Sequence, residues 1–431
     1  MTLKRSKDGS MPMTSPAPQL IPERVWILTG ATGHLGNTVA KWLSLRGAKM
    51  RCLGLEAECP AQLKMLEGPD FLYLSGDIRD PEVLRQLFEG LEGREIIVVH
   101  MAGKISISDT VDPSVYDINI KGTDLMLEAA ARAHAKRFLY VSSVHALAEP
   151  EQDVEIFEQN NYDPERVVGA YAKSKAIATQ HVLSASISRQ KQAAIKAENK
   201  VEAASLASTP SASSQASSPP PTDAPIPSKS AEPSKHSKTL SRLNKESKEL
   251  ERLAQYPAPQ VSMETIVLMP SGIIGPGDFE IGHTTRLFIQ FLKRRMRQAV
   301  HGGYDFTDVR DVAEAIVRAA DLGRDGECYI LANRFYEIAD LLNTLATLTG
   351  IKKITHFVPM TLAKLFCPFA ALYYKLKKQR PLYTKYSLYT LRSHSKFSHA
   401  KAERELGYRP RPLIETMRDT LHFLRRQKWS R

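Results

Sequence analysis

The sequence predicts an α/β fold in which a doubly wound parallel sheet is accompanied by a smaller C-terminal part. Two observations lead to this prediction. Short apolar runs rich in β-branched residues alternate with amphipathic segments of helical length through the N-terminal half of the chain. The first apolar run also leads directly into a glycine-rich turn and then a helix, which is the order that a βα unit requires.

The alternating elements can be followed in order. The helix at residues 81–89 begins with a proline in its first turn, a favoured place for that residue. The predicted strands cover residues 25–28, 49–55, 71–74, 95–100 and 137–142. The predicted helices cover residues 37–46, 81–89, 113–133 and 171–186. Repeated βα units place ligand-binding residues just after the carboxyl ends of the strands, so those positions are the candidate binding residues of this chain.

One stretch of foreign composition divides the chain. Residues 189–260 are rich in Ser, Pro and Ala with few large apolar side chains, so we expect a disordered, low-complexity insertion. It either loops out between two elements or recruits a partner. Residues 1–22 have basic residues without an apolar segment and are expected to be a disordered leader. The sheet domain would comprise residues 23–188 and 261–349, and residues 350–431 a basic C-terminal domain.

The positive charge is concentrated at one end of the chain. The formal charge is +12, yet residues 350–431 alone hold 19 Lys and Arg against 4 Asp and Glu. No nucleic-acid-binding motif accompanies this charge, so we expect no nucleic-acid partner. Residues 354–391 mix aromatic, apolar and basic side chains. They fit either substrate-domain helices with solvated basic residues, which we favour, or a weak contact with a membrane surface.

The cysteines indicate a reducing compartment. Cys52, Cys59, Cys328 and Cys367 form neither a disulfide framework nor a zinc-ligand pair, so we predict free thiols and no metal site. No stretch reaches the roughly eighteen apolar residues of a spanning helix. We therefore expect a cytoplasmic protein.

The glycine-rich turn is the first candidate binding site. Gly30, Gly33 and Gly36 have the spacing G-x-x-G-x-x-G between the first strand and its helix. The first glycine permits the tight turn, the second admits a pyrophosphate close to the backbone, and the third allows close helix–strand packing. The candidate cofactor contacts in this turn are Gly30, Thr32, Gly33, His34, Leu35 and Gly36.

Two further strand ends carry suitable residues. Asp77 and Ile78 follow the third strand, where a carboxylate can accept a hydrogen bond from an adenine amino group. Asp80 is better placed than Asp77 to cap the helix that starts at residue 81. Ala102 and Gly103 follow the fourth strand and offer small side chains where the backbone of a cofactor would pass.

Tyr171 and Lys175 suggest acid/base chemistry. They are four residues apart in a predicted helix and therefore share one face. An ammonium group beside a tyrosine favours the phenolate, so Lys175 would lower the pKa of Tyr171 from its usual value near 10. Ser143, at the end of the fifth strand, could hydrogen-bond the same substrate oxygen. A pair with this spacing is common by chance, so its meaning depends on the surrounding motifs.

The motifs occur in a fixed order. They are TGATGHLG, GDIRD, Asn119 in DINIKGT, VSSVHA, YAKSK, MPSGIIGPGD and YDFTDVRDVAEAIVRA. This order closely resembles the extended short-chain dehydrogenase/reductase family, which includes NAD-dependent epimerase/dehydratase proteins. The resemblance is nearest to the flavonoid-reductase-like and 3-beta-hydroxysteroid-dehydrogenase-like branches, and it covers residues 24–188 and 261–425.

The resemblance implies roles for these residues. Tyr171 would be the general acid/base, Lys175 would hold the nicotinamide ribose, and Ser143 would polarise the substrate oxygen. Asn119 would support the site or a proton relay, although a structural amide is equally consistent with its place in a helix.

The resemblance also implies an NAD(P)-binding Rossmann domain in residues 23–188 and 261–349, and a substrate domain in residues 350–431. Pro270 and Ile273 would line the nicotinamide from the loop after the sixth strand. A Gly/Pro turn without a ligand is the alternative for that loop. Asp311, at a helix start, is expected to be a structural cap.

The preference between NAD and NADP stays open. In this family an Asp at the end of the second strand indicates NAD and an Arg indicates NADP. This chain has only Glu56 there, and Arg51 is expected to point elsewhere. We therefore expect NAD(P) as the cofactor without choosing between the two forms.

The expected activity is the interconversion of a ketone and a secondary alcohol on a hydrophobic or ring-containing small molecule. A nucleotide-sugar epimerase or dehydratase and a non-catalytic NAD(P)-sensing module are the alternatives, and a homodimer is considered for the assembly. Candidate substrate contacts are Ile105, Ile107, His145 and His283.

Overall fold

The computed structural model describes residues 24–66, 68–106, 112–149, 154–192, 194–195, 257–296, 298–362, 385–391 and 396–429. The predicted leader and most of the predicted insertion lie outside these ranges, as do Cys367 and much of the basic segment at 354–391. Within the described ranges, Cys52, Cys59 and Cys328 are free thiols. No helix there combines the length and the apolar character needed to cross a bilayer.

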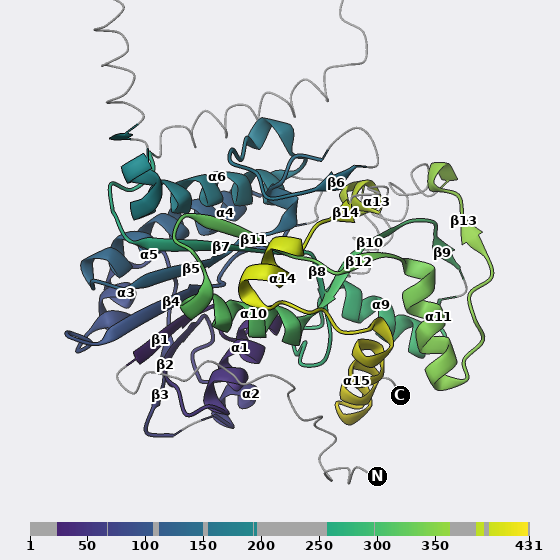
Figure 1. Ribbon diagram of the computed structural model, residues 1–431. Coiled ribbons are helices and arrows are strands. Elements are labelled where there is room, and N and C mark those ends of the chain that lie inside the picture. Colours follow the sequence, from purple (N-terminus) through teal and green to yellow (C-terminus); the bar gives the residue numbers. More distant parts are fainter. Residues whose placement is uncertain are drawn as a thin grey trace, which may run out of the picture.

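Seven parallel strands form the central sheet, in the order β11-β7-β5-β4-β1-β2-β3 (Figure 1). The chain order reverses at β1, which pairs with β2 on one side and with β4 on the other. The strands are β1 (Arg24–Thr29), β2 (Lys49–Gly54), β3 (Phe71–Ser75), β4 (Glu95–His100), β5 (Arg137–Val141), β7 (Glu264–Pro270) and β11 (Glu327–Leu331). The five strands predicted for the N-terminal half are confirmed.

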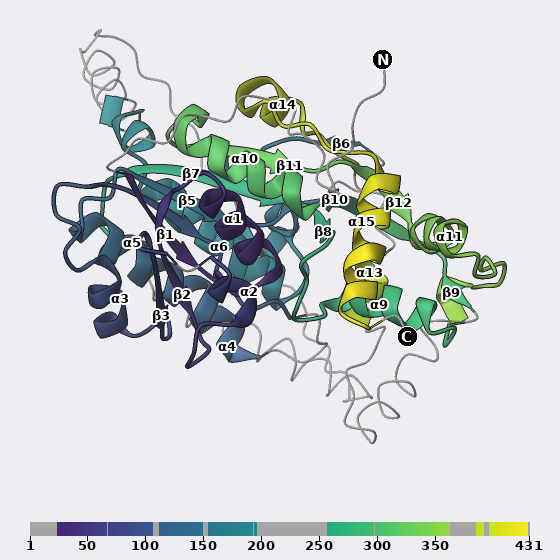
Figure 2. The same cartoon turned by 90° about the horizontal axis from the view of Figure 1, so that it is seen from below.

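Helices cover both faces of this sheet (Figures 1 and 2). Ile27 packs into the core on one face, whereas its neighbours Trp26 and Leu28 pack into the core on the other. The first face carries α3 (Pro81–Phe88), α5 (Gly122–Arg132) and α6 (Ala170–Ser184). The second carries α1 (His34–Ser44), α10 (Val309–Leu322) and α14 (Ala400–Leu406). The doubly wound arrangement is therefore confirmed.

Two predicted helices differ from the observed ones. The first helix begins at His34 rather than at residue 37, so the second half of the glycine-rich turn is already helical. The segment predicted as one helix at 113–133 is α4 (Pro113–Tyr116), a π-helical turn at Asp117–Lys121, and α5. The extra residue of a π-helical turn leaves no trace in a 3.6-residue hydrophobic pattern, so the sequence could not reveal it.

A smaller group of elements lies beside the sheet (Figure 1). Its three-stranded sheet has the order β12 (Arg334–Glu337), β10 (Gly303–Asp308) and β8 (Gly272–Ile274). Helix α11 (Ile338–Thr349) packs against α9 (His283–Leu292) and α15 (Leu413–Arg426). Because α14 packs on α10 and β11 of the larger unit, a domain boundary at residue 350 stays a prediction.

Short elements connect these parts. They are α2 (Ala61–Lys64), α13 (Lys385–Thr390), the 3-10 turns η2 (Val144–Ala146) and η3 (Pro164–Arg166), and the strand pairs β6 (Glu155–Ile156) with β14 (Lys396–Phe397) and β9 (Ala299–Val300) with β13 (Phe357–Val358).

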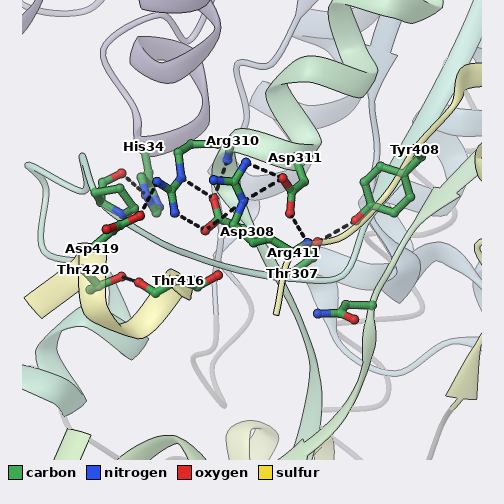
Figure 3. Close-up of polar contacts among 12 residues, drawn as sticks. His34, Thr307, Asp308, Arg310, Asp311, Tyr408, Arg411, Thr416, Asp419 and Thr420 are labelled. Carbon is green, nitrogen blue, oxygen red and sulfur yellow. Dashed lines mark hydrogen bonds and ion pairs between the residues drawn. The ribbon is translucent and has the colours of Figure 1, made fainter. Parts of the chain in front are cut away.

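An ion cluster joins the start of α10 to the C-terminal part (Figure 3). Asp308 caps α10 by accepting a hydrogen bond from the backbone N–H of Arg310. The prediction that Asp311 is the cap is therefore wrong. Asp311 lies within the first turn of the helix and pairs with Arg411, whose Nε lies 2.8 Å from Asp311 Oδ1. Arg310 binds Asp308 and also reaches Asp419 on α15, with an Nη1–Oδ2 distance of 2.6 Å.

Candidate active site

The candidate site begins where the strand order reverses, at the carboxyl ends of β1 and β4. Gly30 has a φ of +67°, and a Cβ there would lie 2.8 Å from the backbone N of Ala102. Ala102 N–H in turn donates to Thr29 Oγ1 over 3.2 Å. The loops after the two strands therefore lie in contact. In doubly wound sheets, this is the crevice in which nucleotides bind.

The other two glycines of the turn have different surroundings. A Cβ on Gly36 would collide with the Gly30 carbonyl, so Gly36 serves the close packing of α1 on the turn. A Cβ on Gly33 would meet only the Gly30 oxygen, at 3.5 Å, so the backbone there is open to a ligand. Gly33 precedes α1 without a side-chain cap, and the first N–H groups of the helix lack partners within the helix. These features fit a bound pyrophosphate.

The remaining residues of the turn have structural contacts as well. Thr32 is buried and Leu35 packs on the core of the second sheet face. His34 Nε2 lies 3.2 Å from the carbonyl oxygen of Pro276, and burial lowers the pKa of His34. Asn37 Nδ2 donates to Gly277 O over 3.0 Å. The turn is thus fastened to the loop that follows β8, and a role of His34 toward a cofactor stays a prediction.

Two carboxylates that follow the third strand have different roles. Asp80 caps α3, as predicted, by accepting from Glu82 N–H. Asp77 instead holds the guanidinium of Arg79, with an Nη2–Oδ2 distance of 2.6 Å, and this hydrogen bond lowers the pKa of Asp77. Asp77 is half-buried and therefore remains open on one side. Ile78 is buried against Gly122 of α5.

The residues at the end of β2 do not distinguish NAD from NADP. Glu56 is exposed and accepts hydrogen bonds from Tyr73 Oη, through its backbone oxygen at 2.9 Å and its side chain at 3.4 Å. Arg51 does point away, as predicted, because its Nη1 donates to the carbonyls of Leu87 and Glu89 at the end of α3.

Tyr171 and Ser143 meet beside this crevice. Tyr171 lies in the first turn of α6, and Ser143 precedes the short turn η2, which packs on α6. A hydrogen bond from Ser143 lowers the pKa of Tyr171, but burial outweighs it and raises that pKa to about 12. The expectation that Lys175 lowers the pKa of Tyr171 is therefore wrong for the protein alone. Tyr171 is a protonated phenol at neutral pH.

Lys175 lies one turn further along α6 and is almost fully buried, with 4% of its surface exposed. Its Nζ donates to Val141 O over 2.8 Å and to Tyr140 Oη over 3.2 Å, and it lies 4.7 Å from the centre of the Tyr140 ring. Burial lowers the pKa of Lys175 to about 7. Among the described residues, no carboxylate forms an ion pair with Lys175.

Asn119 joins the loop after β4 to α6. It lies in the π-helical turn, where its Oδ1 accepts from Lys104 N over 2.7 Å and its Nδ2 donates to Ser174 Oγ over 2.9 Å. The Ser174 hydroxyl donates to Tyr171 O. Gly103 runs alongside, since a Cβ there would lie 3.2 Å from Asn119 Oδ1 and 3.5 Å from Lys175 Nζ. The amide of Asn119 therefore supports the site, and a proton relay through it stays a prediction.

The loop after the sixth strand is more regular than predicted. Pro270 is the last residue of β7, and Ile273 lies in β8, paired with Thr307 of β10. A Gly/Pro turn follows β8 at Pro276 and Gly277, so that alternative stays open. Whether Pro270 and Ile273 line the nicotinamide stays a prediction.

The candidate substrate contacts are dispersed. His145 Nε2 lies 3.2 Å from Tyr304 Oη, its ring stacks on Tyr304, and its ring centre is 6.0 Å from that of Tyr171. Burial lowers the pKa of His145 to about 4. Ile105 and His283 are both exposed, and Ile107 lies outside the described residues.

Three residues close to Lys175 escaped prediction. Tyr140, His100 and Thr123 are fully or almost fully buried and hydrogen-bonded to one another or to the site. The sequence did contain a signal for two of them, because a polar side chain interrupts an apolar strand in each case. His100 ends β4 and Tyr140 lies within β5.

The residues present fit an extended dinucleotide. Gly33 leaves backbone open for phosphate, and Ala102 and Gly103 have small side chains along the crevice. Lys175 is a buried cation with which no carboxylate of the described residues pairs. Fold and site together define the class of Rossmann-type enzymes that use nicotinamide nucleotides.

Comparisons with known proteins agree. Residues 27–196 match the 3-beta hydroxysteroid dehydrogenase/isomerase family. The chain is 23% identical to sterol demethylase protein B of Methylococcus capsulatus over 403 residues, which covers 93% of this chain and 98% of the relative. It is 32% identical to a UDP-glucose 4-epimerase of Streptomyces lividans over 169 residues, which covers 37% of this chain and 46% of that enzyme.

Solved structures show the same fold. The structure of UDP-glucose 4-epimerase from Thermotoga maritima with UDP-glucose aligns with a TM-score of 0.59 at 18% identity, and it covers 94% of this chain and 99% of that one. Over residues 27–196 and in its fold, the chain is thus similar to the extended short-chain dehydrogenase/reductases, in the group of 3-beta-hydroxysteroid dehydrogenase and NAD-dependent epimerase/dehydratase proteins. These matches support an NAD(P)-dependent oxidoreductase of this type.

Proposed function

We propose that the protein interconverts a ketone and a secondary alcohol on a hydrophobic or ring-containing small molecule, with Tyr171 as the acid/base. The observation that carries this proposal is the meeting of Tyr171, Ser143 and Lys175 beside the glycine-rich crevice. Acid/base and cation are held on one helix, and the hydroxyl is supplied by the neighbouring strand end.

Each residue has a defined task in this proposal. In the reducing direction, Tyr171 donates its phenolic proton to the substrate oxygen, and its raised pKa ensures that the proton is present at neutral pH. Ser143 donates a hydrogen bond to the same oxygen and thus orients it. A nicotinamide cofactor, when bound, supplies the hydride for the carbon atom. The Lys175 ammonium lies one helical turn away and would hold the ribose of the nicotinamide nucleotide.

The surroundings of Tyr171 favour an apolar substrate. His145 is neutral at physiological pH because burial lowers its pKa to about 4. Tyr304 stacks on it and also makes edge contacts with Phe306 and Phe397, so aromatic rings adjoin the acid/base. A steroid-like or flavonoid-like ring system suits such a neighbourhood better than a sugar does, because rings of this kind bury apolar area.

An epimerase acting on a nucleotide sugar is the second candidate. The likeness to UDP-glucose 4-epimerases favours it, and the same Tyr, Ser and Lys would serve its ketone intermediate. A sensing module without activity has less support, because a sensor has no use for an acid/base beside its nucleotide.

A substrate screen tests the proposal. Ring-bearing ketones and alcohols would be supplied with NADH or NADPH and NAD or NADP, turnover would be followed by nicotinamide absorbance, and UDP-glucose would be assayed in parallel. Tyr171→Phe is expected to lower turnover at least a hundredfold and to leave nucleotide binding nearly intact. The control is Tyr329→Phe in the edge strand β11, which should remain active.

Two outcomes would contradict the proposal. Full turnover by the Tyr171→Phe variant would exclude Tyr171 as the acid/base. Turnover of UDP-glucose, with no turnover of any ring-bearing ketone or alcohol, would favour the epimerase.

A further inference from the structure

A tyrosine and a histidine are buried side by side behind the candidate site. His100 and Tyr140 are register partners on the adjacent strands β4 and β5, and both are fully buried. Their rings stack with centres 5.8 Å apart and an interplanar angle of 21°. Polar groups without partners are costly in an apolar core, so their hydrogen bonds should be accounted for completely.

The hydrogen bonds of this pair have a single consistent direction. The Thr123 hydroxyl donates its one proton to Asn119 O over 2.7 Å, so its oxygen must accept from His100 Nε2, 3.0 Å away. His100 then carries its proton on Nε2, and its Nδ1 accepts from the Thr29 hydroxyl over 2.7 Å. Burial, followed by the nearby Lys175, lowers the pKa of His100 to about 3, which keeps the ring neutral as this arrangement requires.

Tyr140 connects these groups to Lys175. The Tyr140 hydroxyl oxygen accepts a hydrogen bond from Lys175 Nζ, and Thr123 lies beside that hydroxyl. Val141 O accepts a second N–H of the same ammonium. Two of its three N–H groups are thereby fixed, and the backbone of Gly103 passes close to Nζ. The third N–H is left for a ligand that enters along this loop.

We propose that Tyr140 is a positioning residue that holds the Lys175 ammonium in the direction of a bound nicotinamide nucleotide, and that the stacked ring of His100 keeps Tyr140 in place. The inference rests on the proposed function for the role of Lys175. These buried contacts also reach the glycine-rich turn, because Ala102 N–H donates to the Thr29 hydroxyl and that hydroxyl donates to His100. The backbone that would hold the phosphates and the ammonium that would hold the ribose are thus connected through buried hydrogen bonds and the stacked rings of His100 and Tyr140.

The test is Tyr140→Phe, which removes one oxygen and keeps the ring that packs on His100 and Lys175. Nucleotide affinity would be measured by fluorescence titration without any substrate, and thermal unfolding would be recorded beside it. We expect affinity to fall about fivefold to tenfold, the net effect of one lost hydrogen bond. Tyr329→Phe, which also removes a buried hydroxyl, should leave affinity unchanged.

A double-mutant cycle shows whether Tyr140 acts through Lys175. Adding Tyr140→Phe to Lys175→Met should change nucleotide affinity by less than about twofold, because the ammonium it positions is already absent. Equal losses in both backgrounds would overturn the inference, and so would a lowered unfolding temperature with unchanged affinity. The experiment uses no substrate, so the effect of Tyr140→Phe on nucleotide affinity can be interpreted even if the proposed reaction is wrong.

Discussion

Two buried charged regions of this protein are built in opposite ways. At the start of α10, the Asp308 and Asp311 side chains are 1% and 5% exposed, and each is paired with a guanidinium, of Arg310 and Arg411 respectively. On α6, Lys175 is equally buried, yet its partners are a carbonyl and a phenol, both neutral. The first region satisfies its charges internally and the second does not.

The presence or absence of an opposite charge indicates which of the two regions serves stability and which serves activity. A buried charge with an opposite charge beside it contributes to a specific fold, whereas a buried charge without one is a net cost that folding alone would not favour. The pKa of Lys175, lowered to about 7, reflects that cost. Strongly shifted groups of this kind cluster at functional sites. We therefore propose that the paired cluster serves stability and that the unpaired lysine serves activity.

The largest expected effect is on activity. Lys175→Met removes the unpaired charge and keeps the length of the side chain, so turnover should fall by about 10²–10⁴-fold. The unfolding free energy should change by less than about 2 kcal/mol, because the lost hydrogen bonds offset the relief of a buried charge. Steady-state kinetics and urea unfolding measure the two quantities. A strongly destabilised variant with normal turnover per folded molecule would reverse the assignment.

The next effect is on stability. Arg411→Met leaves Asp311 buried without its guanidinium, and breaking a buried pair in this way costs about 3–5 kcal/mol. Arg409→Met, two residues away on an exposed side chain, is the matched control and should be nearly neutral. Urea unfolding with both variants gives the difference. If the Arg411→Met and Arg409→Met variants were equally stable, the ion cluster at the start of α10 would not stabilise the fold.

Local pattern was enough to predict much of this architecture. The strands of the N-terminal half and the positions of Ser143, Tyr171 and Lys175 follow from apolar runs and from the rule that ligands bind at strand ends. The network behind Lys175 could not be predicted in the same way. It depends on the register that sets His100 beside Tyr140, and nothing local to either strand specifies that register.

The cap of α10 and the pKa of Tyr171 were both predicted wrongly because each depends on residues that are distant in the sequence. Asp308 and Asp311 both precede or begin a helix, and only the partner Arg411, a hundred residues further along the chain, distinguishes the cap from the ion pair. The pKa of Tyr171 depends on how deeply three-dimensional packing buries it, so neighbours in the sequence gave the wrong direction.

The last prediction separates the two regions by pH. The folded pKa of Lys175 is about 7 and its usual value is 10.5, so between these values the unfolded chain holds a proton that the folded protein has released. Stability should therefore rise with pH through this window, and the cost of burying the charge should be fully present below pH 7. Tyr140, Tyr171 and His100 face Lys175 and are present in both proteins, so subtracting the unfolding free energy of Lys175→Met isolates the lysine. We expect the wild type to gain stability relative to this variant from pH 7 to pH 10. A flat difference would mean that the ammonium is compensated in the folded protein, and Lys175 would then belong with the paired charges of α10.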